Sequence, residues 1–176
     1  MWPFTRRAPA VTAQALFDRW FRIQVPEGHP SLDAYEAAIT GEEVARLPKT
    51  FHKLATDGVE RIYQVRRKEL EPDREALVYL DTLLDAEMRW KLTEEQDPAN
   101  PRNLLRVVAT EFGCMVGEIH LHAGKGRWLP FRAPNLWRSR IARADGSEYD
   151  PFFAVVRQLS DERVPGALAG GFDAAR

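Results

Sequence analysis

The 176-residue chain contains one cysteine and no long hydrophobic run. Cys114 cannot form a disulfide within the chain, and its apolar surroundings in the sequence predict a buried, reduced thiol. No stretch approaches the roughly 18 uninterrupted apolar residues that a membrane span requires. The start, MWPFTRRAPAV, lacks the apolar segment that follows the basic residues of a secretory signal. These absences predict a cytoplasmic protein without a membrane span.

An excess of charge of one sign and the familiar catalytic signatures are also missing. The formal net charge is −1, so no overall field attracts nucleic acid or an anionic membrane. The sequence has no GxxxxGKS/T phosphate loop, GxGxxG fingerprint, GxSxG elbow, CxxC or HExxH motif. Cys114 is not expected to act as a nucleophile, because its helical neighbours are apolar. We therefore expect neither a cofactor nor a catalytic centre of a familiar kind.

Apolar residues at helical spacing predict several short helices in the first part of the chain. These are residues 12–23, 31–38, 40–47 and 50–62, the third ending before Pro48. The charged segment 61–75, which contains Pro72, is the best candidate for an internal boundary. We thus divide the chain into an N-terminal helical region (1–68), an α+β core domain (69–163) and a flexible Gly/Ala-rich tail (164–176).

The strongest helical patterns lie in the second half of the chain. Residues 73–92 form one predicted helix, and residues 103–121 carry a wide apolar stripe that places them at the centre of the core. Gly113 and Gly117 lie on one face of this second helix. Each glycine costs a helix about 1 kcal/mol relative to alanine, so the pair indicates a close approach by another element. Asp150 and Pro151 are suited to start a last helix.

Two short segments rich in aromatic and apolar residues, 127–132 and 136–143, predict a β-hairpin. Pro130 makes the first of them an edge strand or an irregular one. The whole pattern predicts an α+β fold, with several helices packed against a small antiparallel sheet or hairpin.

The sequence EIHLH, residues 118–122, offers metal-ligand chemistry in one conformation only. On a strand, Glu118, His120 and His122 would share one face and could hold a transition metal. On a helix only Glu118 and His122 lie together. Because the apolar stripe continues to this point and zinc needs at least three protein ligands in a catalytic site, we expect a helix end and no metal site.

The run FGCMVGEIHLHAGKGRW, followed by a hairpin and by DPFFAVVRQL, resembles a family of uncharacterised bacterial domains of unknown function. The resemblance covers the C-terminal half, from Asp73 onward, and departs from the family pattern at Lys125, His120 and His122. It implies a structural motif but no activity. The matching residues are Gly113, Gly117, Glu118, Gly126, Trp128, Pro151 and Phe152.

Glu118 has two interpretations at this stage. In the structural one it pairs with Arg127 or Arg132, or accepts hydrogen bonds from the hairpin, and so locks the hairpin to the helix. In the catalytic one it needs a second acid or base, and none is evidently spaced to meet it.

The hairpin region is basic and the helix before it is acidic. Between Ile119 and Ala144 there are six Lys or Arg residues and no Asp or Glu, whereas residues 69–97 hold ten acidic and three basic residues. Arginine interleaved with tryptophan is a composition that can contact nucleic acid, an acidic protein or only solvent. The candidate binding surface comprises Trp128, Arg132, Trp137, Arg138 and Arg140.

The leading hypothesis is a non-catalytic cytoplasmic protein that binds another protein or a second copy of itself, in an accessory, regulatory or toxin-neutralising role. One alternative is nucleic-acid binding through the Arg/Trp hairpin, residues 125–143. A third is an enzyme that uses Glu118 with His120 or His122.

Overall fold

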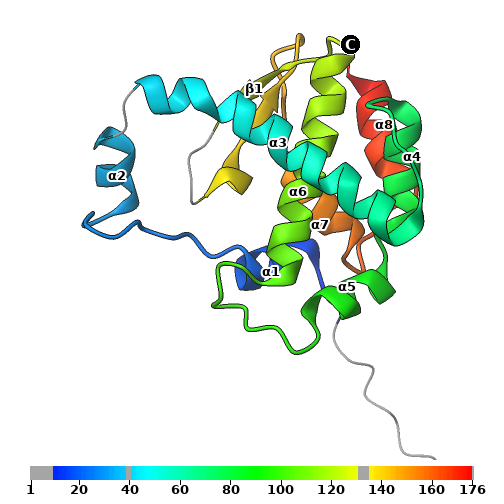
Figure 1. Ribbon diagram of the computed structural model, residues 1–176, viewed down its shortest axis with the longest axis horizontal. Coiled ribbons are helices and arrows are strands. Elements are labelled where there is room, and N and C mark those ends of the chain that lie inside the picture. The colour runs from blue at the N-terminus through cyan, green and yellow to red at the C-terminus, as the bar shows by residue number, and fades with distance from the viewer. Residues whose placement is uncertain (1–9, 39–40, 131–134, 176) are drawn as a thin grey trace, which may run out of the picture.

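The computed structural model describes residues 10–38, 41–130 and 135–175, and it confirms the α+β fold: helices pack against a small antiparallel sheet (Figure 1). The elements within these ranges are α1 (Ala13–Trp20), α2 (Leu32–Ala38), α3 (Gly41–Arg66), α4 (Arg74–Leu83), α5 (Ala86–Thr93), α6 (Leu104–His122), β1 (Arg127–Leu129), a 3-10 turn (Leu136–Arg138), β2 (Arg140–Ala142), β3 (Glu148–Tyr149), α7 (Pro151–Gln158) and α8 (Ala167–Ala174).

Helix α6 is the centre of the core, as its apolar stripe predicts. Helix α3 crosses one side of it, and α7 packs against it as well (Figure 1). Asn103 caps its first turn by accepting a hydrogen bond from the backbone N–H of Arg106 at 2.8 Å. Leu105, Phe112 and Ile119 are buried along its length. The surrounding helices and Trp128 of the sheet together bury most residues of α6.

The two glycines of α6 mark the places where aromatic rings approach its backbone. A Cβ atom on Gly113 would lie 2.3 Å from Phe152 Cδ1, and one on Gly117 would lie 2.1 Å from Trp128 Cζ2. Phe152 belongs to α7 and Trp128 to β1, so the glycines let one helix and the sheet pack directly on α6. The predicted close approach is confirmed.

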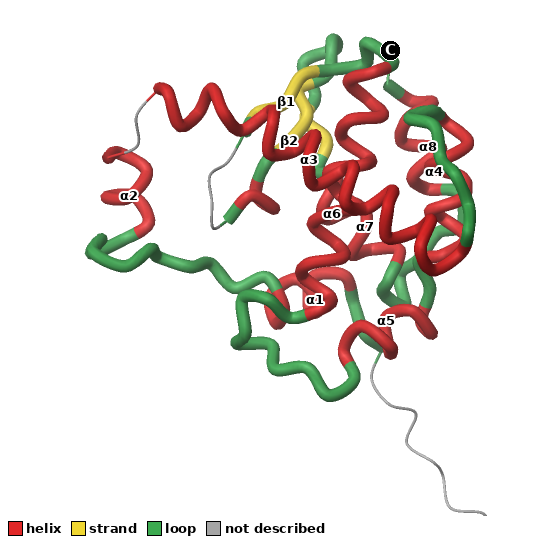
Figure 2. Tube along the Cα trace, in the orientation of Figure 1, coloured by secondary structure: helices red, strands yellow, loops and turns green. Residues whose placement is uncertain are grey.

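The sheet is smaller and differently bounded than the predicted hairpin. Its order is β1-β2-β3, all antiparallel, with Trp128 opposite Ile141 and Ile141 opposite Tyr149 (Figure 2). The second predicted strand begins as a 3-10 turn and becomes extended only at Arg140. Pro130 follows β1 directly and, lacking an N–H, cannot donate to a ladder.

The prediction of separate helices on either side of Pro48 is wrong. Helix α3 runs from Gly41 to Arg66 with Pro48 inside it. An interior proline costs a helix about 3 kcal/mol through a lost hydrogen bond and steric conflict. Leu47 and Phe51 flank it and are both buried in the core, and their burial offsets that cost.

The single helix predicted for residues 73–92 is in fact two helices. Helix α4 ends at Leu83, and α5 begins after Asp85. The Asp85 carboxylate accepts a hydrogen bond from the backbone N–H of Met88 at 2.7 Å, which starts a new helix where the periodic pattern suggested a continuous one.

Most residues of the predicted flexible tail, 164–176, form α8. The Asp81 carboxylate accepts hydrogen bonds from the backbone N–H groups of Leu168 and Ala169 at 3.2 to 3.4 Å. Lys125 donates to the carbonyl oxygens of Phe172 at 3.1 Å and Ala175 at 2.7 Å. The negative charge of Asp81 therefore stabilises the N-terminal end of α8, and the positive charge of Lys125 stabilises its C-terminal end. These contacts compensate for the low helix propensity of the two glycines inside α8.

One hydrophobic core spans the predicted domain boundary. The loop after α3 coincides with the charged connector, but buried residues from both sides of it, such as Phe51 and Leu77, belong to the same cluster. Residues before position 69 and after position 163 therefore contribute to the core. Within the described ranges, every helix is too short or too polar to cross a bilayer.

Candidate functional site

The end of α6 separates the three candidate ligands of EIHLH. Helix α6 continues to His122, so Glu118 and His122 lie on one side while His120 turns into the core. The predicted helix end is confirmed. Among the described residues, no group of three His, Cys, Asp or Glu side chains is placed to hold a metal ion.

His120 is fully buried between the rings of Tyr149 and Phe172, whose centroids lie 4.9 and 5.3 Å away. Neither ring nitrogen has a hydrogen-bond partner among the described residues. Burial lowers the pKa of His120 to about 4, and the nearby cations Arg143 and Lys125 act in the same direction. His120 is thus a neutral core residue, which removes it from the catalytic interpretation of Glu118.

Glu118 connects α6 to the sheet. Its Oε1 accepts a hydrogen bond of 2.8 Å from Nε1 of Trp128, and its Oε2 lies 3.4 Å from Nδ1 of His52. Trp128 is 7% exposed, and its ring stacks on Phe51 with a centroid distance of 4.4 Å. Of the structural alternatives, acceptance of a hydrogen bond from the hairpin is therefore correct, with tryptophan rather than arginine as the donor.

Two substitutions separate the charge of Glu118 from its acceptor role. Glu118→Ala leaves the N–H of Trp128 without its acceptor in a nearly dry position, so we expect the free energy of unfolding to fall by about 1–2 kcal/mol. Glu118→Gln keeps an acceptor oxygen and is expected to cost less than about 1 kcal/mol. Urea denaturation of both variants measures the difference. Equal losses would contradict an anchoring hydrogen bond.

His52 was not anticipated as a partner of Glu118, since 66 residues separate them. Its side chain is 75% exposed, against 23% for Glu118. The sequence contains only a weak indication of this contact. His52 is the first of four residues at i, i+3, i+4 and i+7 on α3, and these face four residues with the same spacing on α6. The two rows are His52, Ala55, Thr56, Val59 and Met115, Glu118, Ile119, His122.

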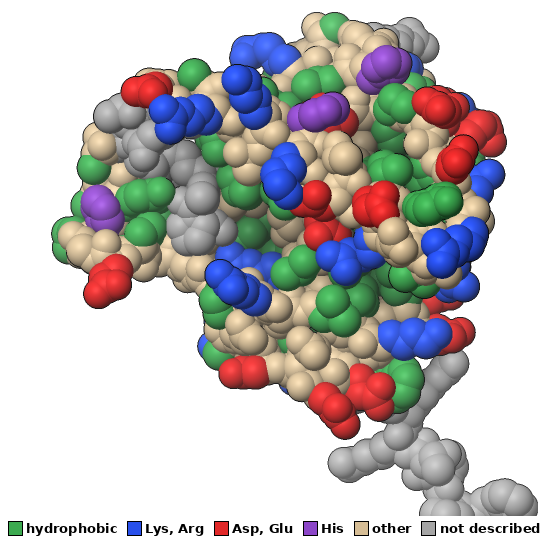
Figure 3. All heavy atoms as spheres, in the orientation of Figure 1, with side chains coloured by type: hydrophobic (Ala, Val, Ile, Leu, Met, Phe, Trp, Pro, Cys, Tyr) green, Lys and Arg blue, Asp and Glu red, His purple; other side chains and the backbone are tan. Residues whose placement is uncertain are grey.

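These rows form the walls of a groove with a volume of about 470 Å³, here called the α3–α6 groove. Leu70, Glu71 and Pro72, from the loop between α3 and α4, complete it together with Ala76. Figure 3 shows hydrophobic side chains exposed on this face, with histidine side chains on one side and acidic side chains on the other. The groove is an open apolar trough with polar groups at its rim.

The charges of the α3–α6 groove have one sign. Glu71 and Glu118 line it, and none of its described lining residues is Lys or Arg. A neighbouring hollow shares Leu70, Glu71 and Ala76 with the groove. That hollow is lined by three more acidic residues and one lysine: Glu69, Asp73, Glu75 and Lys68. The acidic face therefore continues along the loop beyond the groove.

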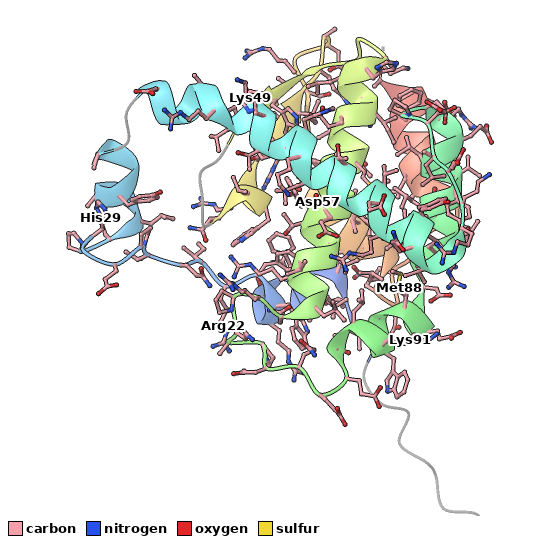
Figure 4. The ribbon with its side chains drawn as sticks, in the orientation of Figure 1. Arg22, His29, Lys49, Asp57, Met88 and Lys91 are labelled. Carbon is pink, nitrogen blue, oxygen red and sulfur yellow. The ribbon has the colours of Figure 1, made fainter. Side chains whose placement is uncertain are left out.

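A second groove lies at the C-terminal end of α3, with a volume of about 340 Å³. Met88 and Lys91 of α5 contribute to it, and Figure 4 shows them beside the C-terminal part of α3. Val65, 70% exposed, and Leu104, 37% exposed, line it as well. Both signs of charge occur here, and Lys91 pairs with Glu87.

The predicted hairpin surface is largely internal. Trp128 and Trp137 are buried, so the expectation of exposed aromatic residues is wrong. Trp137 packs edge-on against Phe17 at a centroid distance of 5.1 Å, because α1 folds back onto the sheet region. Arg132 lies outside the described residues.

The arginines near the sheet also serve the fold. Arg140 forms an ion pair of 3.1 Å with Asp150, and Arg138 is half-buried. Arg143 donates to the carbonyl oxygen of Gly171 at 2.9 Å and lies over the ring of Tyr149. The basic composition of the hairpin is therefore used to hold α7 and α8.

The residues that carried the family resemblance cluster in one packing region. Gly113 contacts Phe152, Gly117 contacts Trp128, and Pro151 occupies the first turn of α7. Cys114 lies between these glycines, fully buried, and burial raises the pKa of its thiol above the ordinary value.

Comparison with known proteins finds no matching family model, no matching curated protein and no matching solved structure.

Proposed function

We propose that the chain is a non-catalytic cytoplasmic protein that binds a partner protein through the α3–α6 groove. The observation that carries this proposal is the groove itself, an apolar trough of about 470 Å³ between two helices, rimmed by polar side chains. Grooves of this kind accommodate the apolar side chains of a protein segment, while rim groups fix its orientation. An accessory or regulatory role follows from such binding.

Catalysis receives less support from the same residues. The 3.4 Å contact between His52 and Glu118 is the one observation that favours an enzyme, since a carboxylate can orient a histidine base. The hydroxyl of Thr56, which also lines the groove, donates to the backbone carbonyl of His52 at 3.0 Å. Cys114 is buried with a raised pKa. The described groove residues thus offer no activated nucleophile.

Nucleic-acid binding through the hairpin also receives less support. Base stacking requires exposed aromatic rings, and Trp128 and Trp137 are buried. Arg140 and Arg143 are engaged with Asp150 and Gly171 respectively. None of these four residues lines the α3–α6 groove, so a protein partner there need not contact them.

Site-directed photo-crosslinking tests the proposal, because Cys114 is the single cysteine and is buried. Thr56→Cys introduces an accessible thiol in the α3–α6 groove, and Val65→Cys introduces one in the second groove. Each is labelled with a benzophenone maleimide and illuminated in an extract of the cells that naturally produce the protein. We expect one partner to be linked from position 56 and not from position 65.

Two further samples make the result decisive. The labelled parent protein reports any reaction at Cys114, which should be absent. Thr56→Arg should abolish co-purification of the linked partner by filling the groove, whereas Val65→Arg should not. A partner linked from position 65 alone would move binding to the second groove, and no link from either position would refute the proposal.

A further inference from the structure

The α3–α6 groove presents negative charge to whatever occupies it. Glu118 on α6 and Glu71 on the loop after α3 are its charged lining residues apart from the histidines, and no lysine or arginine is among its described lining residues. In the adjoining hollow, Glu69, Asp73 and Glu75 outnumber the one lysine, Lys68, so the negative charge extends there. An occupant with negative charge would be repelled, while one with positive charge would be attracted.

One carboxylate oxygen of Glu118, Oε2, can accept a hydrogen bond from an occupant of the groove. Its side chain is 23% exposed and lies among Met115, Ile119 and the other apolar groove residues. Oε1 is occupied by the N–H of Trp128, whereas Oε2 makes a contact of 3.4 Å with His52, near the long limit for a hydrogen bond. For a carboxylate on a mostly buried side chain, a charged donor makes a stronger hydrogen bond than a neutral one.

The shape of the region favours a chain segment over a compact small molecule. The α3–α6 groove is open to solvent, and it borders the adjoining hollow at the shared residues Leu70, Glu71 and Ala76. An occupant that fills the apolar floor and also reaches Glu69 or Asp73 in the hollow must extend past Glu71. A segment of polypeptide with side chains of two kinds meets both requirements.

We infer that the α3–α6 groove recognises a segment of a partner protein in which apolar side chains alternate closely with lysine or arginine. The apolar side chains occupy the floor between α3 and α6, and a cation lies against Oε2 of Glu118 within reach of the field of Glu71. This inference rests on the proposed function and names the chemistry of the partner.

A displayed library of random peptides, selected on the full-length protein, tests the inference even while the partner is unidentified. Selected peptides are expected to be enriched in Lys or Arg next to Leu, Ile, Met or Phe. The same selection on the double variant Glu71→Gln with Glu118→Gln should lose that enrichment. Glutamine retains the acceptor for Trp128, so the fold is preserved while the charge is removed.

A synthetic copy of the most enriched peptide measures how much the two carboxylates contribute to the affinity. We expect its affinity to fall about tenfold in the double variant, and also when salt is raised from about 50 mM to about 500 mM. Glu87→Gln, in the second groove, is the matched control and should leave the affinity unchanged. Three outcomes would overturn the inference. They are selected peptides without basic residues, a library that yields no binding peptide, and equal affinity of the peptide for the parent and the double variant.

The two proposals can fail separately. A partner that is crosslinked from position 56 but binds the double variant as tightly as the parent overturns the basic-segment inference and leaves the proposed function standing. Absence of any crosslinked partner refutes the proposed function whatever peptides the library yields.

Discussion

Gly117→Ala is expected to lower the free energy of unfolding by about 2–3 kcal/mol, although alanine is the better helix former. The added methyl carbon would lie 2.1 Å from Cζ2 and 2.3 Å from Cη2 of Trp128. The indole cannot move away easily, because Phe51 stacks on it and Glu118 holds its N–H. Overpacking therefore outweighs the gain of up to about 1 kcal/mol in helix propensity. Urea denaturation measures the change.

Gly170→Ala is the matched control, since Gly170 lies inside α8 with no atom within 4 Å of an added Cβ. Here only helix propensity changes, so we expect a stabilisation of up to about 1 kcal/mol. Gly113→Ala should behave like Gly117→Ala, because its methyl group would lie 2.3 Å from the ring of Phe152. If all three variants gained stability alike, the close packing of α6 described above would be incorrect.

The features of the fold that depend on local sequence could be predicted. The stripe of α6, its Asn103 cap and the start of α7 at Asp150 and Pro151 each follow from residues within a few positions of one another. The glycine row of α6 predicted close contacts without identifying the partners. Those partners, Phe152 and Trp128, come from elements that only the folded chain brings to α6.

The errors in the predicted fold arise where tertiary contacts override a local signal. Pro48 is a strong helix breaker, yet the burial of Leu47 and Phe51 keeps α3 continuous through it. The composition of α8 suggested flexibility, but Asp81 and Lys125, distant in sequence, hold its two ends. Local composition could not reveal either partner.

At the candidate site, too, local features could be predicted from the sequence and tertiary contacts could not. Glu118 was singled out from the sequence, and its contact with the sheet was among the expected outcomes. His52 and Glu71 were not, because the groove forms only when α3 and the following loop pack beside α6. Composition alone places Trp128 and Trp137 on a binding surface, because arginine interleaved with tryptophan is typical of one. Their burial depends on tertiary contacts with Gly117 and Phe17.

The structure gives the two oxygens of Glu118 different surroundings. Oε1 holds Trp128, while Oε2 faces His52 and the groove. Because Trp128 packs against Gly117, the carboxylate that presents charge to the groove is fixed by the same contacts that fix the sheet. Substitutions that loosen Trp128 should therefore lower the stability of the protein and weaken the binding that we propose at the groove.

The burial of His120 should make the protein less stable in mild acid. An unfolded histidine takes up a proton near pH 6.5, whereas burial keeps the pKa of His120 at about 4 in the folded protein. Between these values the unfolded state binds more protons, so the free energy of unfolding falls as the pH falls. Over the whole window this one residue should cost up to about 3 kcal/mol.

The variant His120→Leu should remove this dependence, because leucine fills the site between Tyr149 and Phe172 without a titrating group. Its unfolding free energy, measured in urea from about pH 7 to about pH 4, should fall less steeply than that of the parent. Asp81 and Asp150, whose pKa values burial raises, act in the opposite direction in both proteins and cancel in the comparison. Parallel curves for parent and His120→Leu would show that His120 takes up its proton equally well in the folded protein, and that α8 and β3 do not seal it from water.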